Sequence, residues 1–472
     1  MPSSRAAEQP SRRALSGATA GRGRGLALTE ATSVPSIESV RPLRATYDPD
    51  HEGAIASAPY RRDRRIHRSS SHPRPRVLQL LATGGSGGAQ ESYSGLLLHL
   101  DRSAYEVRAL SLSRGSAVQR LRRLGLEVDV IEETDDDAAI HELTAHLRRH
   151  EVDLLHAHMY RAEVIGTRAA IAAETPVVMA TVHSSRVRSA EDVAVLAALT
   201  PAMDRLIVPS DAIEAKVRHE GRGGAAFSVI PNGVDLARFD LPLDSSSLRR
   251  EFGIPGEAPL FGVVARLEPE KGHRYLVEAM PAILRGAPEA WLVFVGEGSL
   301  EEELRAQAAA LPRSAADRIV FTGRREDVAA ITGELDVAVM PSLREAQGIS
   351  ILEAMARRRP VVASAVGGIP EVLTDGLDGI LVPPADPGAL ADACIRLARS
   401  PELRARMGEA GRATVEQRFS LDAMVRRIEQ VYDGELVRAG ALPWLRVGGV
   451  GQAVGVRSRR PIGRATHEVP PL

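Results

Sequence analysis

Two glutamates eight positions apart, Glu345 and Glu353, are the residues whose type and spacing say most about chemistry. The residues between them form a small polar loop that leads into an apolar, helix-forming run. The apolar segment 335–340 just upstream predicts a buried strand, so the local order is strand, loop and helix. A helix N-terminus favours a phosphate, and two carboxylates can accept hydrogen bonds from sugar and ribose hydroxyls. The segment therefore predicts a site for a sugar nucleotide.

Arg266 and Lys271 form a second pair of chemically useful residues, in a turn that follows the predicted strand 260–265. An arginine fork and a lysine point charge could grip a diphosphate and stabilise the charge that develops when it leaves. An exposed pair on a solvated turn is the alternative. Because Lys216 and Lys271 are the only lysines in the chain, a lysine here is an unusual choice. Beside the paired glutamates we favour the phosphate role.

A glycine-rich loop, 84–88, follows the first apolar strand, 76–81, and precedes a helical run. It fails the dinucleotide-binding fingerprint, because Gln90 stands where a third small residue should pack and the strand 105–112 ends without an acidic residue. We expect a turn at Gly85 that allows close approach of a ligand. A purely structural turn is the alternative, since glycine is the usual residue of tight turns.

Three histidines lie at the ends of strands in the first half of the chain. His183 follows the strand 176–182, where it would contact a sugar or assist a proton transfer. A structural histidine is the alternative. His156 and His158 suggest a metal, but we reject zinc because no Cys, Asp or Glu cluster completes a ligand set nearby.

Two turns of the second half have weaker signals. Gly323 and Arg324 end the strand 318–322 and could border a base pocket through backbone contacts, with ordinary turn chemistry as the alternative. Glu371 follows a glycine turn and falls in the first turn of a helix, where its carboxylate would complement the helix dipole.

Strand-like and helix-like segments alternate along most of the chain, which predicts parallel sheets covered on both faces. We expect an α/β protein with two Rossmann-like, doubly wound domains, 75–240 and 256–416, facing across a cleft. A looser segment, 236–257, separates them, and a late helix at 417–440 follows them. Ligands of such sheets bind at the carboxyl ends of the strands, and all of the residues singled out above follow a strand. The predicted strands are 76–81, 105–112, 127–131, 152–156, 176–182 and 205–209, then 260–265, 290–296, 318–322, 335–340, 360–364 and 379–382.

Composition limits the remaining classes. The 472 residues suit two or three domains, and 44% of them are hydrophobic, enough for sizeable cores. A formal net charge of −1 favours no polyanionic partner, and we expect no binding of nucleic acid. The lone Cys394 is compatible with a reducing compartment. No apolar run reaches the roughly 20 residues of a spanning helix, so a cytoplasmic protein is the expectation.

Both ends of the chain have the composition of disordered tails. Segment 1–74 is rich in Ser, Pro, Gly and Arg without apolar periodicity, and 441–472 is rich in Gly, Arg and Pro. The arginine cluster at 61–65 would suit a weak tether to an anionic surface. A solvated tail or an over-extended start is the blander alternative.

Taken together, residues 76–437 resemble the retaining glycosyltransferases of family 4, which have the GT-B fold. Segment 344–355 is similar to the family's paired-glutamate motif, and 264–272 to its Arg/Lys diphosphate clamp. Segments 84–90 and 229–235 match more loosely. Ala346 and Gln347 depart from the glycine and the aromatic residue that many members carry, which bears on the choice of donor.

The resemblance implies a role for each candidate residue. Arg266 and Lys271 would hold the donor diphosphate, Glu345 would accept hydrogen bonds from the donor sugar, and His183 would lie near the reacting centre. Gly85 would let the first domain approach the phosphate. Glu353 would bind the ribose, and Gly323 and Arg324 would border the base. Backbone amides for the sugar and phosphate would come from Gln347, Gly348, Ile349 and Ser350.

The implied reaction moves a sugar from a UDP- or GDP-sugar to a glycan, lipid-linked or small-molecule acceptor, with retained anomeric configuration. It needs no cofactor and no metal, because the Arg/Lys pair would replace the cation. The expected setting is bacterial cell-envelope or exopolysaccharide biosynthesis, in the cytoplasm, with peripheral contact to the inner face of the membrane. The late helix would cross back to the first domain. A sugar-nucleotide epimerase on a similar scaffold and a non-catalytic sugar-nucleotide-binding protein are the alternatives.

Overall fold

The computed structural model describes residues 73–85, 87–240 and 247–441. The predicted disordered tails, 1–74 and 441–472, lie outside this part of the chain except for residues 73, 74 and 441. Two parallel sheets organise the described residues, as the alternation of strands and helices predicted. We refer to residues 73–240 as the first half and to residues 247–418 as the second half.

The first half is built on a seven-stranded parallel sheet with the order β3-β2-β1-β4-β5-β6-β7. Its central strands are buried along their whole length, because helices cover both faces. Helices α3, α4 and α6 pack on one face and α1 and α2 on the other. The elements are β1 Arg76–Leu81, α1 Gly88–His99, β2 Glu106–Ser111, α2 Ser116–Arg123, β3 Asp129–Val130, α3 Asp136–Arg149, β4 Leu154–His158, α4 Tyr160–Ala172, β5 Val177–Thr181, α5 Ala190–Leu199, β6 Arg205–Val208, α6 Asp211–His219 and β7 Ala226–Val229.

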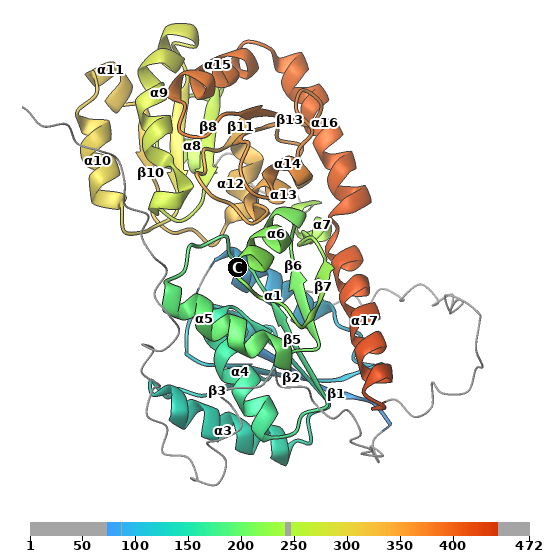
Figure 1. Cartoon of the computed structure of the whole chain (residues 1–472). Coiled ribbons are helices and arrows are strands. Elements are labelled where there is room, and N and C mark those ends of the chain that lie inside the picture. Colours follow the sequence, from blue (N-terminus) through green and yellow to red (C-terminus); the bar gives the residue numbers. More distant parts are fainter. Residues whose placement is uncertain (1–72, 86, 241–246, 442–472) are drawn as a thin grey trace, which may run out of the picture. The chain divides into compact units, whose positions relative to one another are not determined.

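The second half repeats this plan with a six-stranded parallel sheet in the order β10-β9-β8-β11-β12-β13 (Figure 1). Helices α9 and α15 cover one face, and α13 and α16 pack on the other. Its elements are β8 Leu260–Val264, α9 His273–Gly286, β9 Trp291–Val295, α10 Glu301–Ala309, α11 Arg313–Ala316, β10 Ile319–Phe321, α12 Val328–Glu334, β11 Val337–Met340, α13 Ile349–Ala356, β12 Val361–Ser364, α14 Ile369–Val372, β13 Gly379–Val382, α15 Pro387–Ala398 and α16 Pro401–Arg418.

The last helix, α17 Leu421–Arg438, completes the core of the first half rather than that of the second (Figure 1). Its apolar residues, with Tyr432 and Leu436 both 0% exposed, pack under strands β1, β4, β5 and β6. The expected late helix therefore does cross back. It starts later than predicted, at Leu421, because α16 continues to Arg418 and Ser420 caps the new helix by accepting from the amide of Ala423.

Other details of the prediction were also wrong, and the strand β7, Ala226–Val229, was not among the predicted strands. The segment 236–257 was expected to be loose, but it contains two short helices, α7 Leu236–Asp240 and α8 Ser247–Glu251. The strand predicted at 152–156 lies two residues later, as β4. None of the helices in the described ranges combines the length and apolar character needed to cross a bilayer.

Candidate functional site

The order of the strands determines where the predicted residues meet. In both sheets successive strands are added first toward one edge and then toward the other. The change occurs between two central parallel neighbours, β1 and β4 in the first half and β8 and β11 in the second. The loops that leave such neighbours diverge and form a crevice at their carboxyl ends, which is where ligands bind in open α/β sheets. Lys271 follows β8 and Glu345 follows β11, so the fold brings these two predicted residues to one crevice.

Lys271 and Glu345 form an ion pair in which both side chains are largely buried, 18% and 11% exposed. The second carboxylate oxygen of Glu345 accepts a hydrogen bond of 3.1 Å from the amide of Ala346. The two opposite charges thus neutralise each other. A diphosphate that reached this point would compete with Glu345 for the lysine.

Close backbone packing holds the lysine in place. Gly272, directly after it, has a φ of 68°, and a β-carbon there would lie 2.0 Å from the carbonyl oxygen of Pro341, so only glycine fits. The amide of Leu343 donates to the carbonyl of Glu270 at 2.8 Å. These contacts bind the loop after β8 to the loop after β11.

Arg266 lies in the same loop as Lys271 but does not contact Glu345. Its side chain is 55% exposed and pairs at 3.0 Å with Glu270, four residues further along the chain. Exposed pairs of this kind contribute little to stability. The guanidinium is therefore free to leave Glu270 for a stronger anion.

Helix α13 points its N-terminus into this crevice. Gly348, at its N-cap, has a φ of 91°, and no side chain caps the helix, so the amides of Ile349 and Ser350 are oriented toward the crevice. A β-carbon at Gly88 would lie 3.4 Å from Cδ1 of Ile349. The glycine loop of the first half and the N-terminus of α13 are therefore in contact distance.

The side chain of Gln347 joins the two halves. Its Oε1 accepts from the backbone amide of Asn232 at 2.7 Å and from Nδ2 of the same residue at 2.8 Å, and its Nε2 donates to the carbonyl of Asn232. Gln347 is 1% exposed. Only its backbone is left for the predicted contact with a donor. Sequence reasoning missed Asn232, although it lies in the segment 229–235 that matched the family.

Glu353 lies in the second turn of α13 and is buried, at 9% exposure. Burial, with a smaller effect from the nearby charge of Glu91, raises the pKa of its carboxyl group to about 7, and Arg238 opposes this rise. Among the described residues no side chain donates a hydrogen bond to this carboxyl group. Such an unsatisfied acceptor suits the two hydroxyls of a ribose.

Two glycines of the loop after β1 differ in what they allow. A β-carbon at Gly84 would lie 2.7 Å from the carbonyl oxygen of Ser113, whereas one at Gly85 would meet nothing closer than 3.7 Å. Gly84 is therefore required by packing, and the space beside Gly85 remains open. That Gly85 faces a ligand stays a prediction.

His183 is half-buried at the end of β5, and its Nε2 lies 3.0 Å from Nδ1 of His158. The two rings are stacked, with centroids 5.3 Å apart. Burial lowers the pKa of His183 to about 4, so its imidazole is neutral at physiological pH. His183 makes this contact rather than one with Lys271 or Glu345.

Gly323 and Arg324 follow β10, at the far edge of the second sheet. Gly323 has a φ of 69°, a β-carbon there would meet nothing within 4 Å, and Arg324 is exposed. No contact in the described part of the chain joins them to the crevice, and their role at a base stays a prediction.

Glu371 has a function that the sequence did not reveal. Its two carboxylate oxygens accept from the amides of Asp211 and Ala212, both at 2.9 Å. It therefore caps α6 of the first half instead of its own helix. Next to it, the hydroxyl of Ser210 donates to the carbonyl of Ala346 at 2.8 Å, so the paired-glutamate loop is fixed to the first half from two sides.

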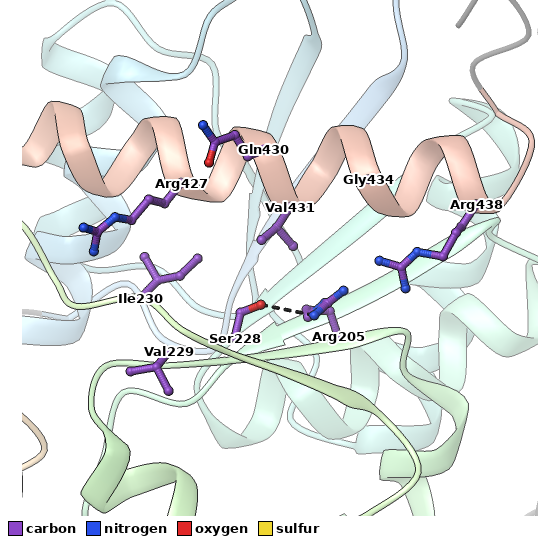
Figure 2. A pocket seen from close by; sticks show the side chains of 9 residues that line it. All are labelled: Arg205, Ser228, Val229, Ile230, Arg427, Gln430, Val431, Gly434 and Arg438. Atoms are coloured by element: carbon purple, nitrogen blue, oxygen red, sulfur yellow. Dashed lines mark hydrogen bonds between the residues drawn. The ribbon is translucent and has the colours of Figure 1, made fainter. Parts of the chain in front are cut away.

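A separate hollow of about 370 Å³ lies between α17 and the edge strand β7 (Figure 2). Two of its three arginines, Arg205 and Arg438, already pair with Glu435, whose side chain is 1% exposed. None of the predicted site residues lines it. Within the described ranges, no group of three His, Cys, Asp or Glu residues is placed to hold a metal ion.

Comparison with protein families gives two matches. Residues 244–414 match the family described as Glycosyl transferases group 1, and residues 86–238 match Glycosyltransferase Family 4. The boundary between the matches falls between the two halves described above.

Curated relatives carry related names. The phosphatidyl-myo-inositol mannosyltransferase of Mycobacterium leprae is 34% identical over 291 residues, 60% of this chain and 74% of that protein. The GDP-mannose-dependent monoacylated alpha-(1-6)-phosphatidylinositol monomannoside mannosyltransferase of Corynebacterium glutamicum is 34% identical over 220 residues, 44% of this chain. The match spans 56% of the latter protein's length, about half.

Solved structures share the fold. Anabaena Alr3699/HepE in complex with UDP-glucose superposes with a TM-score of 0.69 at 22% identity, over 76% of this chain and 99% of that one. WaaG, a glycosyltransferase involved in lipopolysaccharide biosynthesis, gives 0.59 at 19% identity, over 76% of this chain and 100% of that one. At such identities the likeness concerns architecture, and it confirms the expected GT-B fold of two Rossmann-like domains.

Proposed function

The chain belongs to the group 1, family 4 glycosyltransferases, and we propose that it transfers a sugar from a UDP- or GDP-sugar to a glycan, lipid-linked or small-molecule acceptor. The observation that carries the proposal is the Lys271–Glu345 ion pair, buried in the crevice beside the uncapped N-terminus of α13. A cation, a carboxylate and helix amides are what a diphosphate sugar requires. A relative named for GDP-mannose and a structural neighbour that holds UDP-glucose support a nucleotide-sugar donor.

Binding of the donor exchanges partners within the site. The diphosphate takes Lys271 from Glu345, the helix amides of α13 share its charge, and Arg266 turns from Glu270 to join them. The released carboxylate of Glu345 then accepts hydrogen bonds from the sugar hydroxyls, and Glu353 accepts those of the ribose. The ion pair between Lys271 and Glu345 thus keeps both groups in position until the donor replaces it.

The transfer step follows from these positions. The bond between the anomeric carbon and the diphosphate oxygen breaks, and the acceptor oxygen bonds to the same face of the sugar, which retains the configuration. The acceptor proton passes to the departing diphosphate. Lys271, Arg266 and the amides of α13 stabilise the negative charge on that diphosphate, which is the role a metal ion plays elsewhere. The proposal therefore includes no metal and no other cofactor.

The proposal extends to the acceptor and the cellular setting. The relative of Mycobacterium leprae is named for a phosphatidylinositol acceptor, which suits a peripheral enzyme on the inner face of the cytoplasmic membrane. Envelope or exopolysaccharide biosynthesis is the corresponding pathway class. Co-sedimentation with anionic liposomes, with and without residues 1–74, tests the membrane contact.

The decisive experiment compares Glu345→Ala and Lys271→Ala in binding and in transfer. Radiolabelled UDP- and GDP-sugars are offered with glycan and lipid acceptors, and nucleoside diphosphate affinity is measured by calorimetry. Glu345→Ala should lower transfer about 100-fold while binding the nucleoside diphosphate at least as tightly as wild type, because Lys271 loses its competitor. Lys271→Ala should weaken that binding by roughly 1.5–3 kcal/mol, the contribution of a charged hydrogen bond.

The chain supplies its own control in its other lysine. Lys216 pairs with Glu220 on α6, so Lys216→Ala removes the same charge from an ion pair outside the crevice and should change neither property. A protein that neither transferred a sugar nor bound any nucleotide sugar would refute the proposal. Donor binding without turnover would indicate a sugar-nucleotide-binding protein instead.

A further inference from the structure

A chain of hydrogen-bonded side chains leads from His183 into the interior of the first half. Nε2 of His183 lies 3.0 Å from Nδ1 of His158, and Nε2 of His158 lies 2.9 Å from Oε1 of Gln79. Nε2 of Gln79 in turn donates to the hydroxyl of Tyr432 at 2.7 Å. Since Tyr432 belongs to α17, this chain joins the end of β5 to the last helix.

The chain continues beyond the tyrosine. Its hydroxyl lies 2.6 Å from Nδ1 of His156, whose Nε2 lies 2.7 Å from the hydroxyl of Thr181. Gln79, His156 and Tyr432 are 0% exposed. Polar groups so deeply buried are costly unless they are satisfied, and here each side-chain nitrogen and oxygen of Gln79, His156 and Tyr432 has a partner.

The chemistry of Gln79 determines the direction of the hydrogen bonds. Its Oε1 can only accept, so Nε2 of His158 must carry a proton. Burial, followed by repulsion from the two neighbouring histidines, lowers the pKa of His158 well below its usual value, so the ring is neutral. A neutral ring protonated at Nε2 has a lone pair at Nδ1, which must accept from Nε2–H of His183.

The same reasoning fixes the outer nitrogen of His183. Because this ring is also neutral and its proton is on Nε2, its Nδ1 carries a lone pair. No hydrogen bond joins that Nδ1 to another of the described residues. A half-turn of the Gln79 amide would reverse every bond and make Nδ1 of His183 a donor, so one buried amide decides how His183 meets a ligand.

We propose that His158, Gln79 and Tyr432 are positioning residues that hold His183 with an unprotonated Nδ1, ready to accept a hydrogen bond from a sugar hydroxyl. The inference rests on the proposed function, because it requires a sugar at the carboxyl end of the first sheet. It assigns Tyr432 a second role beyond packing: the helix that completes the core also orients a side chain of the site.

The direct test reads the tautomer and needs no turnover. Nitrogen-15 NMR of the protein labelled at histidine, with His183→Gln to assign the signal, should show His183 protonated at Nε2 and not at Nδ1 near pH 7. A proton on Nδ1, or a doubly protonated ring, would overturn the inference even if the enzyme transfers sugar normally. Conversely, failure to transfer with any donor would refute the proposed function without changing the tautomer.

The kinetic test compares two buried tyrosines, of which only Tyr432 belongs to the series of hydrogen bonds that ends at His183. Tyr432→Phe should lower kcat about tenfold with little change in the KM for the nucleotide sugar, because Gln79 loses the partner that orients its amide. Tyr105 is the matched control, because it is 1% exposed and its ring meets that of Tyr432 edge-on. Its hydroxyl donates to Asp433 at 2.6 Å, which is not part of the series of hydrogen bonds that ends at His183. Tyr105→Phe should keep kcat, and an equal fall in both variants would reduce the role of Tyr432 to packing.

Discussion

The carboxyl group of Glu353 has a raised pKa, and this single residue links the pH to the stability of the protein. Burial, followed by the nearby charge of Glu91, raises the pKa of this carboxyl group, so it is protonated over a range in which a free glutamate is ionised. A ribose would provide the missing donors. Hydrogen bonds from a ribose would stabilise the ionised carboxylate of Glu353.

This environment predicts a dependence of stability on pH. The folded pKa is about 7 against an ordinary value of 4.5, so the unfolded chain releases a proton that the folded protein keeps. The contribution of Glu353 to stability therefore falls as pH rises from 4.5 to 7 and is constant above that range, by about 3 kcal/mol in all. Glu353→Gln removes this fall, which denaturant unfolding at pH 5 and pH 8 would measure.

The difference between variant and wild type isolates this group from the other titrating residues. Glu334 offers a control, since it is also buried, at 6% exposure, but accepts from the amides of Leu248 and Arg249. Glu353→Gln should raise the free energy of unfolding at pH 8 relative to wild type, and Glu334→Gln should not. Parallel pH curves for wild type and Glu353→Gln would show that Glu353 is not protonated in the fold.

The sequence predicted that Lys271 and Glu345 each follow a strand, but it did not predict that the two side chains pair with each other. Lys271 and Glu345 were each predicted from a motif after a strand, and the parallel topology is enough to bring those strand ends together. Their ion pair depends on how far the two side chains extend and on the close backbone packing at Gly272. The spacing of residues in the sequence does not predict either. The partners of His183 come from β1, β4 and α17, far apart in the sequence.

Strands were easier to predict from the sequence than short helices and helix caps. Alternating apolar runs predicted nearly all strands, because burial on both faces leaves a continuous hydrophobic signature. Short elements such as α7 and α8 have no such signature and were missed. The role of Glu371 was also missed, because a carboxylate in a first helical turn normally serves its own helix.

The cap predicts a local effect of mutation. Glu371→Ala removes both acceptors of the first-turn amides of α6 and should destabilise the protein by about 1–2 kcal/mol. Hydrogen exchange should accelerate at Asp211 and Ala212 before it does in the sheet. Glu402→Ala, at the exposed first turn of α16, should have an effect within about 0.5 kcal/mol; unchanged exchange in α6 would disprove the cap.

At the scale of the whole molecule, polar contacts join the two halves around the crevice itself. Gln347 meets Asn232, Ser210 meets Ala346, and Glu371 caps α6. The same loop that carries Glu345 is therefore part of the joint between the halves. A ligand at Glu345 would therefore act directly beside Ala346 and Gln347, the residues that contact the first half.

This link predicts that Gln347→Leu separates binding from transfer. The change leaves the amide and carbonyl of Asn232 unpaired, so the halves should come apart more easily and transfer should fall about tenfold. Nucleoside diphosphate affinity should remain, because Lys271 and α13 belong to one half. Gln307→Leu, which removes a single exposed bond to the carbonyl of Arg274, is the control, and a loss of affinity matching the loss of transfer would contradict the link.

The position of α17 also has a consequence for synthesis on the ribosome. Residues 73–240 emerge before the second half, yet the face of their sheet that includes Val77, Leu154 and Met179 packs in part against residues 421–438. Until that last helix has been translated, the first half exposes an apolar surface to solvent and to neighbouring chains. Translation must therefore pass through the entire second half before the first can finish folding, and nascent chains stopped before Leu421 should depend on chaperones to stay soluble.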